Sequence, residues 1–425
     1  MHNTMFQRAA GFLIAAAILL TGMSPPVRAL ADLPDRISLR TGEQLTLAAA
    51  LPLDAEVAQT GSALASAKLD RLADQGTPQL RLTAGQEDGE AELVFRLMGW
   101  LPLKRVNVSV ANKQPVRLIP GGQSIGVALL TKGVVVVGAS DLGRKPSPAR
   151  TAGLKAGDRI VSINGTAISS AGQLADMVQD DSPCLLEIVR EDKEMTVEIT
   201  PALDRRDGSH RLGMWVRDST AGIGTLSFYD PESGVFGALG HAVADVDTGI
   251  ILPISSGGIY ESRVTAVNKG RQGTPGELIG EFFDAETQMG EIRLNTQTGI
   301  FGPAKAQIVN PLYPDGLPIA ARGEVHTGEA ELLTTLTDGG ITAYACEIER
   351  VDTSGDGGSR SLLVHITDPA LLEATGGIVQ GMSGSPLIQD GRIIGAVTHV
   401  LVNDPTRGYA VFIENMLAAS RGEKG

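Results

Sequence analysis

The stretch from Ile378 to Gly391 reads IVQGMSGSPLIQDG and carries two serines, Ser383 and Ser385, in one glycine-rich turn between apolar runs. A hydrolytic serine needs a base for its proton, a group that orients the base, and backbone donors where the oxyanion develops. Gly381 and Gly384 allow a sharp turn, so that the amides of Gly381 and Ser383 can converge as an oxyanion hole. The pattern therefore predicts Ser383 as a nucleophile, although similar turns also occur without chemistry.

A histidine is the usual base for such a serine, and the chain has six histidines. His241, in FGALGHAVADVDTG, follows a run of small residues from which a loop can project an imidazole without crowding. On position alone it is the favoured base. The other histidines are His2 in the amino-terminal segment, which is excluded, His210 and His326 among polar neighbours, and His365 and His399 in apolar runs typical of core histidines.

The group that orients the base is expected to be a carboxylate. Asp368, in HITDPALLEATGG, ends a strand-like run and lies 15 residues before Ser383, so one hairpin could bring the two together. The same aspartate precedes a proline, a pair that commonly starts a turn, and this interpretation stays open. Asp245 and Asp247 lie close to His241 in the sequence, where an aspartate more often caps a turn.

Composition predicts a mainly β protein. The 425 residues, 42% of them hydrophobic, suffice for two or three domains with cores of their own. Aromatic residues make up only 4%, and 52 glycines with many Val, Ile, Thr and Leu runs favour short strands over long helices. Because the net charge is -13 and the basic residues form no stripe, nucleic acid is not expected as a partner.

The first 31 residues have the pattern of an export signal. Arg8 precedes an uncharged apolar stretch over residues 9–23, and Ala29-Leu30-Ala31 resembles a cleavage site. The alternatives are a buried helix or, if the site is not cut, a membrane anchor. The rest of the chain is expected to work outside the cytoplasm.

Strand-like runs and turn residues divide the remainder into three units. Residues 32–113 predict a small β domain to which no catalytic residue is assigned. Residues 211–425 contain many short strands with glycine turns, which predict a closed barrel or a pair of barrels, followed by one helix in ENMLAASR.

The unit over residues 115–201 resembles a PDZ domain. Its AGLKAGDRIVSING block combines glycine turns with a short strand that ends at an Asn-Gly turn, and SAGQLADMVQ predicts a helix. An apolar-Gly-apolar segment lies upstream, made of Ser124, Ile125, Gly126 and Val127. In PDZ domains the equivalent loop receives a peptide carboxylate while the peptide adds a strand to the sheet, so this segment is the predicted peptide site. A generic glycine-rich hairpin is the alternative.

Metal and cofactor chemistry are not predicted. Cys184 and Cys346 lie far apart in apolar runs, which favours buried small side chains, and a single disulfide between them stays open. There is no H-E-x-x-H or comparable ligand set, so a metallopeptidase is disfavoured.

Taken together, the stretches PGGQSIGV, GALGHAV and TDPALLEATGGIVQGMSGSPLIQDG, with the export segment, resemble the SpoIVB peptidase family of endospore-forming bacteria. The resemblance implies a serine endopeptidase whose triad is His241, Asp368 and Ser383, on a chymotrypsin-like β-barrel domain. Ser385 would then be a turn residue or a supporting donor.

The family also implies a place and a partner. The enzyme is expected in the space between the mother cell and forespore membranes, where it cuts a membrane-bound regulatory protein. That cut switches on an intramembrane protease and hence a late sporulation sigma factor. The PDZ unit is implied in recognising targets, including the enzyme's own chain. A PDZ-bearing scaffold whose barrel has lost activity is the alternative from another class.

Overall fold

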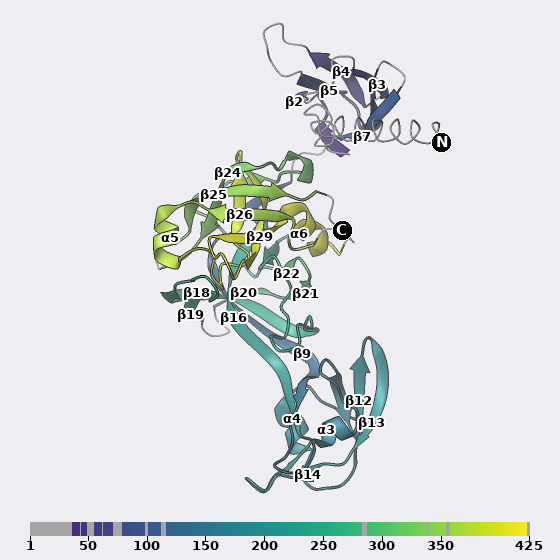
Figure 1. Cartoon of the computed structure of the whole chain (residues 1–425), viewed down its shortest axis with the longest axis vertical. Coiled ribbons are helices and arrows are strands. Elements are labelled where there is room, and N and C mark those ends of the chain that lie inside the picture. The colour runs from purple at the N-terminus through teal and green to yellow at the C-terminus, as the bar shows by residue number, and fades with distance from the viewer. Residues whose placement is uncertain are drawn as a thin grey trace, which may run out of the picture. The chain divides into compact units, whose positions relative to one another are not determined.

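The computed structural model describes residues 36–42, 44–48, 55–61, 63–70, 79–97, 101–111, 116–282, 287–337, 340–353 and 358–422 (Figure 1). The chain divides after Pro115 into two units. The predicted export segment lies outside the described residues. No helix within the described ranges is both long enough and apolar enough to cross a bilayer.

The first unit consists of two small sheets. Alternating apolar side chains such as Leu93 and Phe95 on one strand, and Val106 and Val108 on its neighbour, point into a shared core. The strands are β1 (Arg36–Arg40), β2 (Gln44–Ala48), β3 (Ala55–Thr60), β4 (Leu64–Asp70), β5 (Gln79–Ala84), β6 (Gly89–Leu97) and β7 (Leu101–Ala111). Their orders are β1-β7-β6-β3 and β2-β5-β4.

Two long antiparallel strands run through the second unit, β9 (Ser124–Ala139) and β16 (Met214–Asp230). They pair along almost their full length, from Met214 opposite Ala139 to Thr225 opposite Ser124. One end of the pair belongs to the PDZ-like elements and the other end to the peptidase-like strands (Figure 1). The two parts therefore share one strand pair rather than being joined by a flexible linker.

The PDZ-like part packs around its own core, to which Val134, Ile160, Leu174 and Leu186 contribute. In β12 the exposed and buried residues alternate, as expected of a strand with one face on the core. Besides the ends of β9 and β16, its elements are α3 (Pro148–Thr151), β10 (Arg159–Ile163), β11 (Thr166–Ala167), α4 (Ala171–Asp176), β12 (Cys184–Arg190), β13 (Lys193–Ile199), β14 (Ala202–Leu203) and β15 (His210–Arg211).

The other ends of β9 and β16 enter a larger sheet, in which Leu226, Phe236 and Ile300 are fully buried. Its further elements are β8 (Arg117–Pro120), β17 (Val235–Ala238), β18 (Ile254–Asn268), β19 (Glu277–Phe282), β20 (Gln288–Glu291), β21 (Leu294–Thr296), β22 (Gly299–Pro303) and β23 (Leu317–Pro318). A short 3-10 turn, η2 (Arg322–Glu324), follows.

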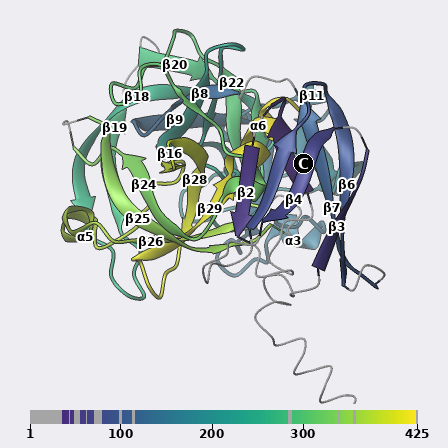
Figure 2. The same ribbon diagram turned by 90° about the horizontal axis from the view of Figure 1, so that it is seen from above.

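A closed barrel completes the chain, in the order β24-β25-β26-β29-β28-β27 (Figure 2). The strands are β24 (Gly328–Thr334), β25 (Thr342–Val351), β26 (Leu362–Ile366), β27 (Pro386–Gln389), β28 (Arg392–Val400) and β29 (Arg407–Phe412). Two helices accompany them, α5 (Pro369–Thr375) and α6 (Ile413–Ser420). The mainly β fold with a PDZ domain and a barrel, predicted from the sequence, is confirmed.

The structure draws the boundary of the PDZ part differently from residues 115–201. Residues 117–131 pair with β16, β18 and β23, and Ile119, Ile125 and Val127 lie in the core of the peptidase-like sheet. Conversely, Leu212 contributes to the PDZ core. The sequence pattern placed these segments by their order in the chain, whereas long strands carry them into the neighbouring part.

Gly126 provides a test of this arrangement, because a Cβ there would lie 2.0 Å from a ring carbon of Phe282. We expect Gly126→Ala to lower the free energy of unfolding by about 1–3 kcal/mol through overpacking. Gly138→Ala on the same strand is the control, since nothing lies within 4 Å of its added Cβ. Stability would be measured by urea unfolding. Equal stability of the two variants would contradict the close packing of Phe282 against Gly126.

Candidate active site

Ser383 lies in the turn between α5 and β27, on a backbone that alternates between satisfied and open amides. The amide of Met382 donates to Val379 at 3.1 Å and that of Gly384 to Val397 at 2.7 Å. Within the described residues, the amides of Gly381 and Ser383 donate to no acceptor. Gly381 and Gly384 have φ of +96° and +99°, which an L side chain rarely adopts. Two open amides beside a serine are the donors that an oxyanion hole requires.

Thr225 of β16 ties this turn to the segment that carries His241. Its amide donates to the carbonyl of Ser383 at 3.0 Å and its Oγ1 donates to that of Gly381 at 2.7 Å. Its carbonyl accepts from the amide of Leu239 at 3.2 Å. Thr225 is only 1% exposed, so these bonds form out of contact with water.

His241 follows β17 after two consecutive left-handed residues, Leu239 and Gly240. Its Nδ1 lies 2.8 Å from the carbonyl oxygen of Ala242. A carbonyl can only accept, so Nδ1 carries the proton and Nε2 is the basic nitrogen. Burial lowers the pKa of His241, although the bond to Ala242 acts in the opposite direction.

A second imidazole accompanies the first. The ring of His399, in β28, has its centroid 5.0 Å from that of His241. Burial, with smaller contributions from His241 and Arg360, lowers the pKa of His399 to about 4. Its Nδ1 is buried and has no hydrogen-bond partner within the described residues. Sequence reasoning set His399 aside as a core histidine, and strand pairing is what brings it to the site.

The hydroxyl of Ser383 donates to the carbonyl of Thr398 at 2.9 Å, next to His399 in the chain. No hydrogen bond joins Ser383 to His241 in the described part of the chain. In unliganded enzymes such catalytic contacts are often longer than in the substrate complex. The structure thus gathers Ser383, His241 and His399 around Thr398.

No interaction joins Asp368 to His241 or Ser383 among the described residues, and its orienting role stays a prediction. It is the N-cap of α5, where Oδ1 accepts from the amides of Ala370 at 2.8 Å and Leu371 at 3.2 Å. Its Oδ2 accepts from the amide of Ala345 at 3.2 Å. Proline at the first helical position makes an aspartate before it a helix cap, the alternative that the Asp-Pro pair had left open.

The remaining predicted residues take structural places. Ser385 is fully buried, and its Oγ has no partner within the described residues. Cys184 and Cys346 are buried and free, so the disulfide is absent. His365 lies 3.3 Å from Glu349 and His326 lies 2.8 Å from Asp390. The described residues contain no group of three or more metal-ligating side chains that could hold an ion.

The peptide site predicted at Ser124, Ile125, Gly126 and Val127 is wrong. These residues are the start of β9, and their strand pairs with β16 on one side and with β18 on the other. A peptide joins a sheet through an unpaired strand edge, and this segment has none.

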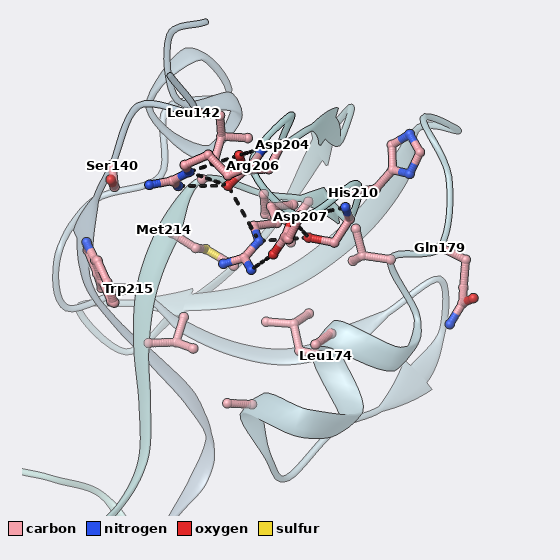
Figure 3. Close-up of a pocket in the computed structure, with 18 of the residues that line it drawn as sticks. Ser140, Leu142, Leu174, Gln179, Asp204, Arg206, Asp207, His210, Met214 and Trp215 are labelled. Atoms are coloured by element: carbon pink, nitrogen blue, oxygen red, sulfur yellow. Dashed lines mark hydrogen bonds and ion pairs between the residues drawn. The ribbon is translucent and has the colours of Figure 1, made fainter. Parts of the chain in front are cut away.

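An open edge lies instead at the start of β16. Residues 214–217 pair with β9 on one side, and no described strand pairs with their other side. A cavity of about 840 Å³ lies here, lined among others by Leu174, Met214 and Trp215 (Figure 3). Leu212-Gly213-Met214 repeats the apolar-Gly-apolar pattern of Ile125-Gly126-Val127, so the sequence contains this signal twice.

The cap and the triad make opposite predictions for Asp368. We expect Asp368→Asn and Asp368→Ser to keep peptidase activity within about tenfold, because Asn and Ser cap helices as well as Asp does. Asp368→Ala should lower the free energy of unfolding by about 1 kcal/mol. Turnover and urea unfolding are the measurements. A loss of about 10⁴ in turnover for the folded Asn variant would support the orienting role.

Buried His399 should make stability depend on pH. Its pKa of about 4 in the folded protein lies below the ordinary value of 6.5, so between these pH values the unfolded chain binds the additional proton. Stability from this group is therefore present above pH 6.5 and is lost as the pH falls toward 4. In urea titrations across this range, His399→Leu should show a flatter dependence than the wild type. Equal slopes would contradict the buried neutral imidazole.

Two family models match parts of this chain. Residues 208–417 match the family model of SpoIVB peptidase S55, and residues 142–190 match that of the PDZ domain. A Lactococcus lactis protein that carries the name zinc metalloprotease is 31% identical over 104 residues. The match covers 24% of this chain and only 22% of the length of that relative.

Two solved structures are also similar. The PDZ domain of an SdrC-like protein from Listeria monocytogenes is 25% identical and covers 20% of this chain and 87% of its own, with a TM-score of 0.18. The inactive form of the Rv3671c protease of M. tuberculosis is 17% identical and covers 48% of this chain and 84% of its own, with a TM-score of 0.28. The family match, and not these overlaps, carries the assignment. Residues 208–417 belong to the SpoIVB peptidase family, and the chain is a serine endopeptidase with a PDZ domain.

Proposed function

We propose that this peptidase is exported during sporulation and cleaves the extracytoplasmic part of a membrane-bound regulatory protein, as well as its own chain. The cut would activate an intramembrane protease and hence a late sigma factor. The space between the mother cell and forespore membranes is the proposed location. The family match to a sporulation peptidase supports this role.

In the proposed mechanism, Oγ of Ser383 bonds to the carbonyl carbon of the scissile peptide and its proton passes to Nε2 of His241. The open amides of Gly381 and Ser383 receive the oxyanion. Collapse of the tetrahedral intermediate breaks the C–N bond, and the leaving amine takes the proton from His241. Water then hydrolyses the acyl-enzyme by the reverse sequence of proton transfers.

The observation that carries this mechanism is the pair of open amides on the Ser383 turn, held beside the His241 segment by Thr225. Backbone donors fixed by a buried contact stabilise developing charge without reorganising during the reaction. Buried backbone donors are nearly always paired, so an open amide at buried Gly381 favours a functional turn over a simple hairpin connection.

The PDZ part is proposed to select substrates. An extended peptide can pair with residues 214–217 of β16 and place an apolar side chain against Leu174 of α4. The cavity there has both apolar walls and charged groups, among them Arg206 and Arg211. It fits a peptide end better than a folded surface, and self-processing would use the same edge.

Cleavage of the chain and of a partner tests the proposal directly. Purified wild type, Ser383→Ala and Ser385→Ala would be incubated with the extracytoplasmic domain of a candidate membrane protein, and mass spectrometry would locate the cuts. We expect Ser383→Ala to lose about 10⁶-fold in turnover, because its hydroxyl forms the acyl-enzyme. Ser385→Ala should keep most activity.

Ser385→Ala is the matched control, since both changes remove one hydroxyl from the same turn. Circular dichroism would confirm that each variant is folded. If Ser383→Ala cleaved at the wild-type rate and Ser385→Ala were inactive, the assignment of Ser383 as the nucleophile would be wrong. If the wild type cut only its own chain and not the candidate membrane protein, the peptidase assignment would stand and the proposed regulatory substrate would be wrong.

A further inference from the structure

The segment that follows His241 is a tight turn built around a buried carboxylate. Asp245 donates its amide to the carbonyl of Ile250 at 2.9 Å, and Ala244 forms an isolated bridge with Ile251. Oδ1 of Asp245 accepts from the amide of Thr248 at 2.9 Å and from its hydroxyl at 2.9 Å. The Asp245 side chain is 0% exposed, so its charge needs a partner inside the protein.

Arg217 of β16 supplies that partner from outside the segment. Its Nε lies 2.5 Å from Oδ2 of Asp245 as an ion pair without hydrogen-bond alignment, and its Nη2 lies 3.0 Å from Oδ2 of Asp247. Burial acts to raise the pKa of Asp245, but the Thr248 bonds and the charge of Arg217 outweigh it and lower the pKa. Without Arg217, Oδ2 of Asp245 would be buried with no donor near it.

The position of Arg217 links this turn to the proposed peptide groove, which is the cavity beside the open edge of residues 214–217. It ends the open edge of β16, directly after Val216, and the next residue, Asp218, accepts from the amide of Ala171 at the start of α4. A second contact lies nearby, because a Cβ on Gly157 of the AGLKAGD block would be 2.3 Å from Cδ1 of Ile250. The PDZ part thus meets the segment after His241 at two points, through Arg217 at the end of the open edge and through Gly157, which lies outside the cavity lining.

We propose that Arg217 is a positioning residue, which holds His241 in place through Asp245 from the peptide-binding strand of the PDZ part. The inference rests on His241 being the base of the proposed mechanism. A peptide that pairs with residues 214–217 fixes the strand that carries Arg217, and so it also fixes the turn behind His241. Even a substrate too small for the groove depends on this contact.

The test is hydrolysis of a small ester by the full chain with Arg217→Met, Arg217→Lys or Arg217→Met with Asp245→Asn. Arg217→Met should lower kcat about tenfold to a hundredfold with KM little changed, since misplacing a catalytic group by about 1 Å costs this much. Arg217→Lys keeps a cation beside Asp245 and should recover most of kcat. The double variant removes the stranded charge, so it should recover stability but not kcat.

Arg190→Met is the matched control. Arg190 pairs at 2.6 Å with Asp158, whose side chain is 1% exposed and which directly follows Gly157. Removing Arg190 therefore disturbs the neighbourhood of the Gly157–Ile250 contact while it leaves the Arg217–Asp245 pair in place. This variant should lose stability as Arg217→Met does, while kcat per folded molecule stays at the wild-type value. A loss of kcat equal to that of Arg217→Met would show that any damage to the PDZ part suffices, and would overturn the positioning role.

The pH profile separates positioning from general damage. His241 faces His399 from β28, with Arg360 beyond it, and on its own segment it contacts the carbonyl of Ala242. Burial holds the pKa of His241 low. If Arg217→Met releases the turn toward solvent, the acid limb of kcat/KM should move to higher pH, while that of Arg190→Met should not move.

His241→Ala separates a failure of the base assignment from a failure of the role proposed for Arg217. Full ester hydrolysis by His241→Ala would overturn the base assignment itself. An inactive His241→Ala together with unchanged kcat and pH profile in Arg217→Met would leave the base in place and overturn only the role of Arg217.

Discussion

The site depends on one buried threonine. Thr225 bonds through its amide, hydroxyl and carbonyl, and these three groups reach two chain segments that are more than a hundred residues apart in sequence. One segment ends with the open amides around Ser383 and the other leads into His241. An added Cβ at Gly384 would lie 2.1 Å from the carbonyl oxygen of Thr225, so only glycine allows the turn to approach this closely. The catalytic geometry is therefore a consequence of backbone packing on β16.

The same strand also carries the proposed peptide edge. β16 begins in the PDZ part at Met214, passes Arg217 and reaches Thr225 within the peptidase sheet. A continuous strand paired with β9 transmits displacement better than a flexible linker would, because its hydrogen bonds resist independent movement of its ends. The proposed peptide edge and Thr225, which holds the Ser383 turn, therefore lie on one strand.

The sequence predicted the elements whose signals are local. The glycine turn at Ser383, the helices in SAGQLADMVQ and ENMLAASR, and the PDZ block depend on neighbouring residues, and the structure contains them. The errors arose where a residue's role depends on distant partners. The pattern at Gly126 reads the same as that at Gly213, but only strand pairing shows which edge is open. Asp368 illustrates the same limit, since a carboxylate before proline suits both a cap and a triad.

The Nδ1–H of His241 donates to a backbone carbonyl, which is an acceptor that carries no full charge. The carbonyl of Ala242 fixes the tautomer, as a carboxylate would, but it stabilises the imidazolium less. His399 beside it has a pKa of about 4, so its ring is neutral at neutral pH and supplies no charge that could balance an imidazolium on His241. Because burial also disfavours the protonated form, proton transfer to His241 is costly in this conformation. Small movements of the segment after His241 then change the cost of that transfer, which makes its anchoring by Arg217 a point of control over the chemistry.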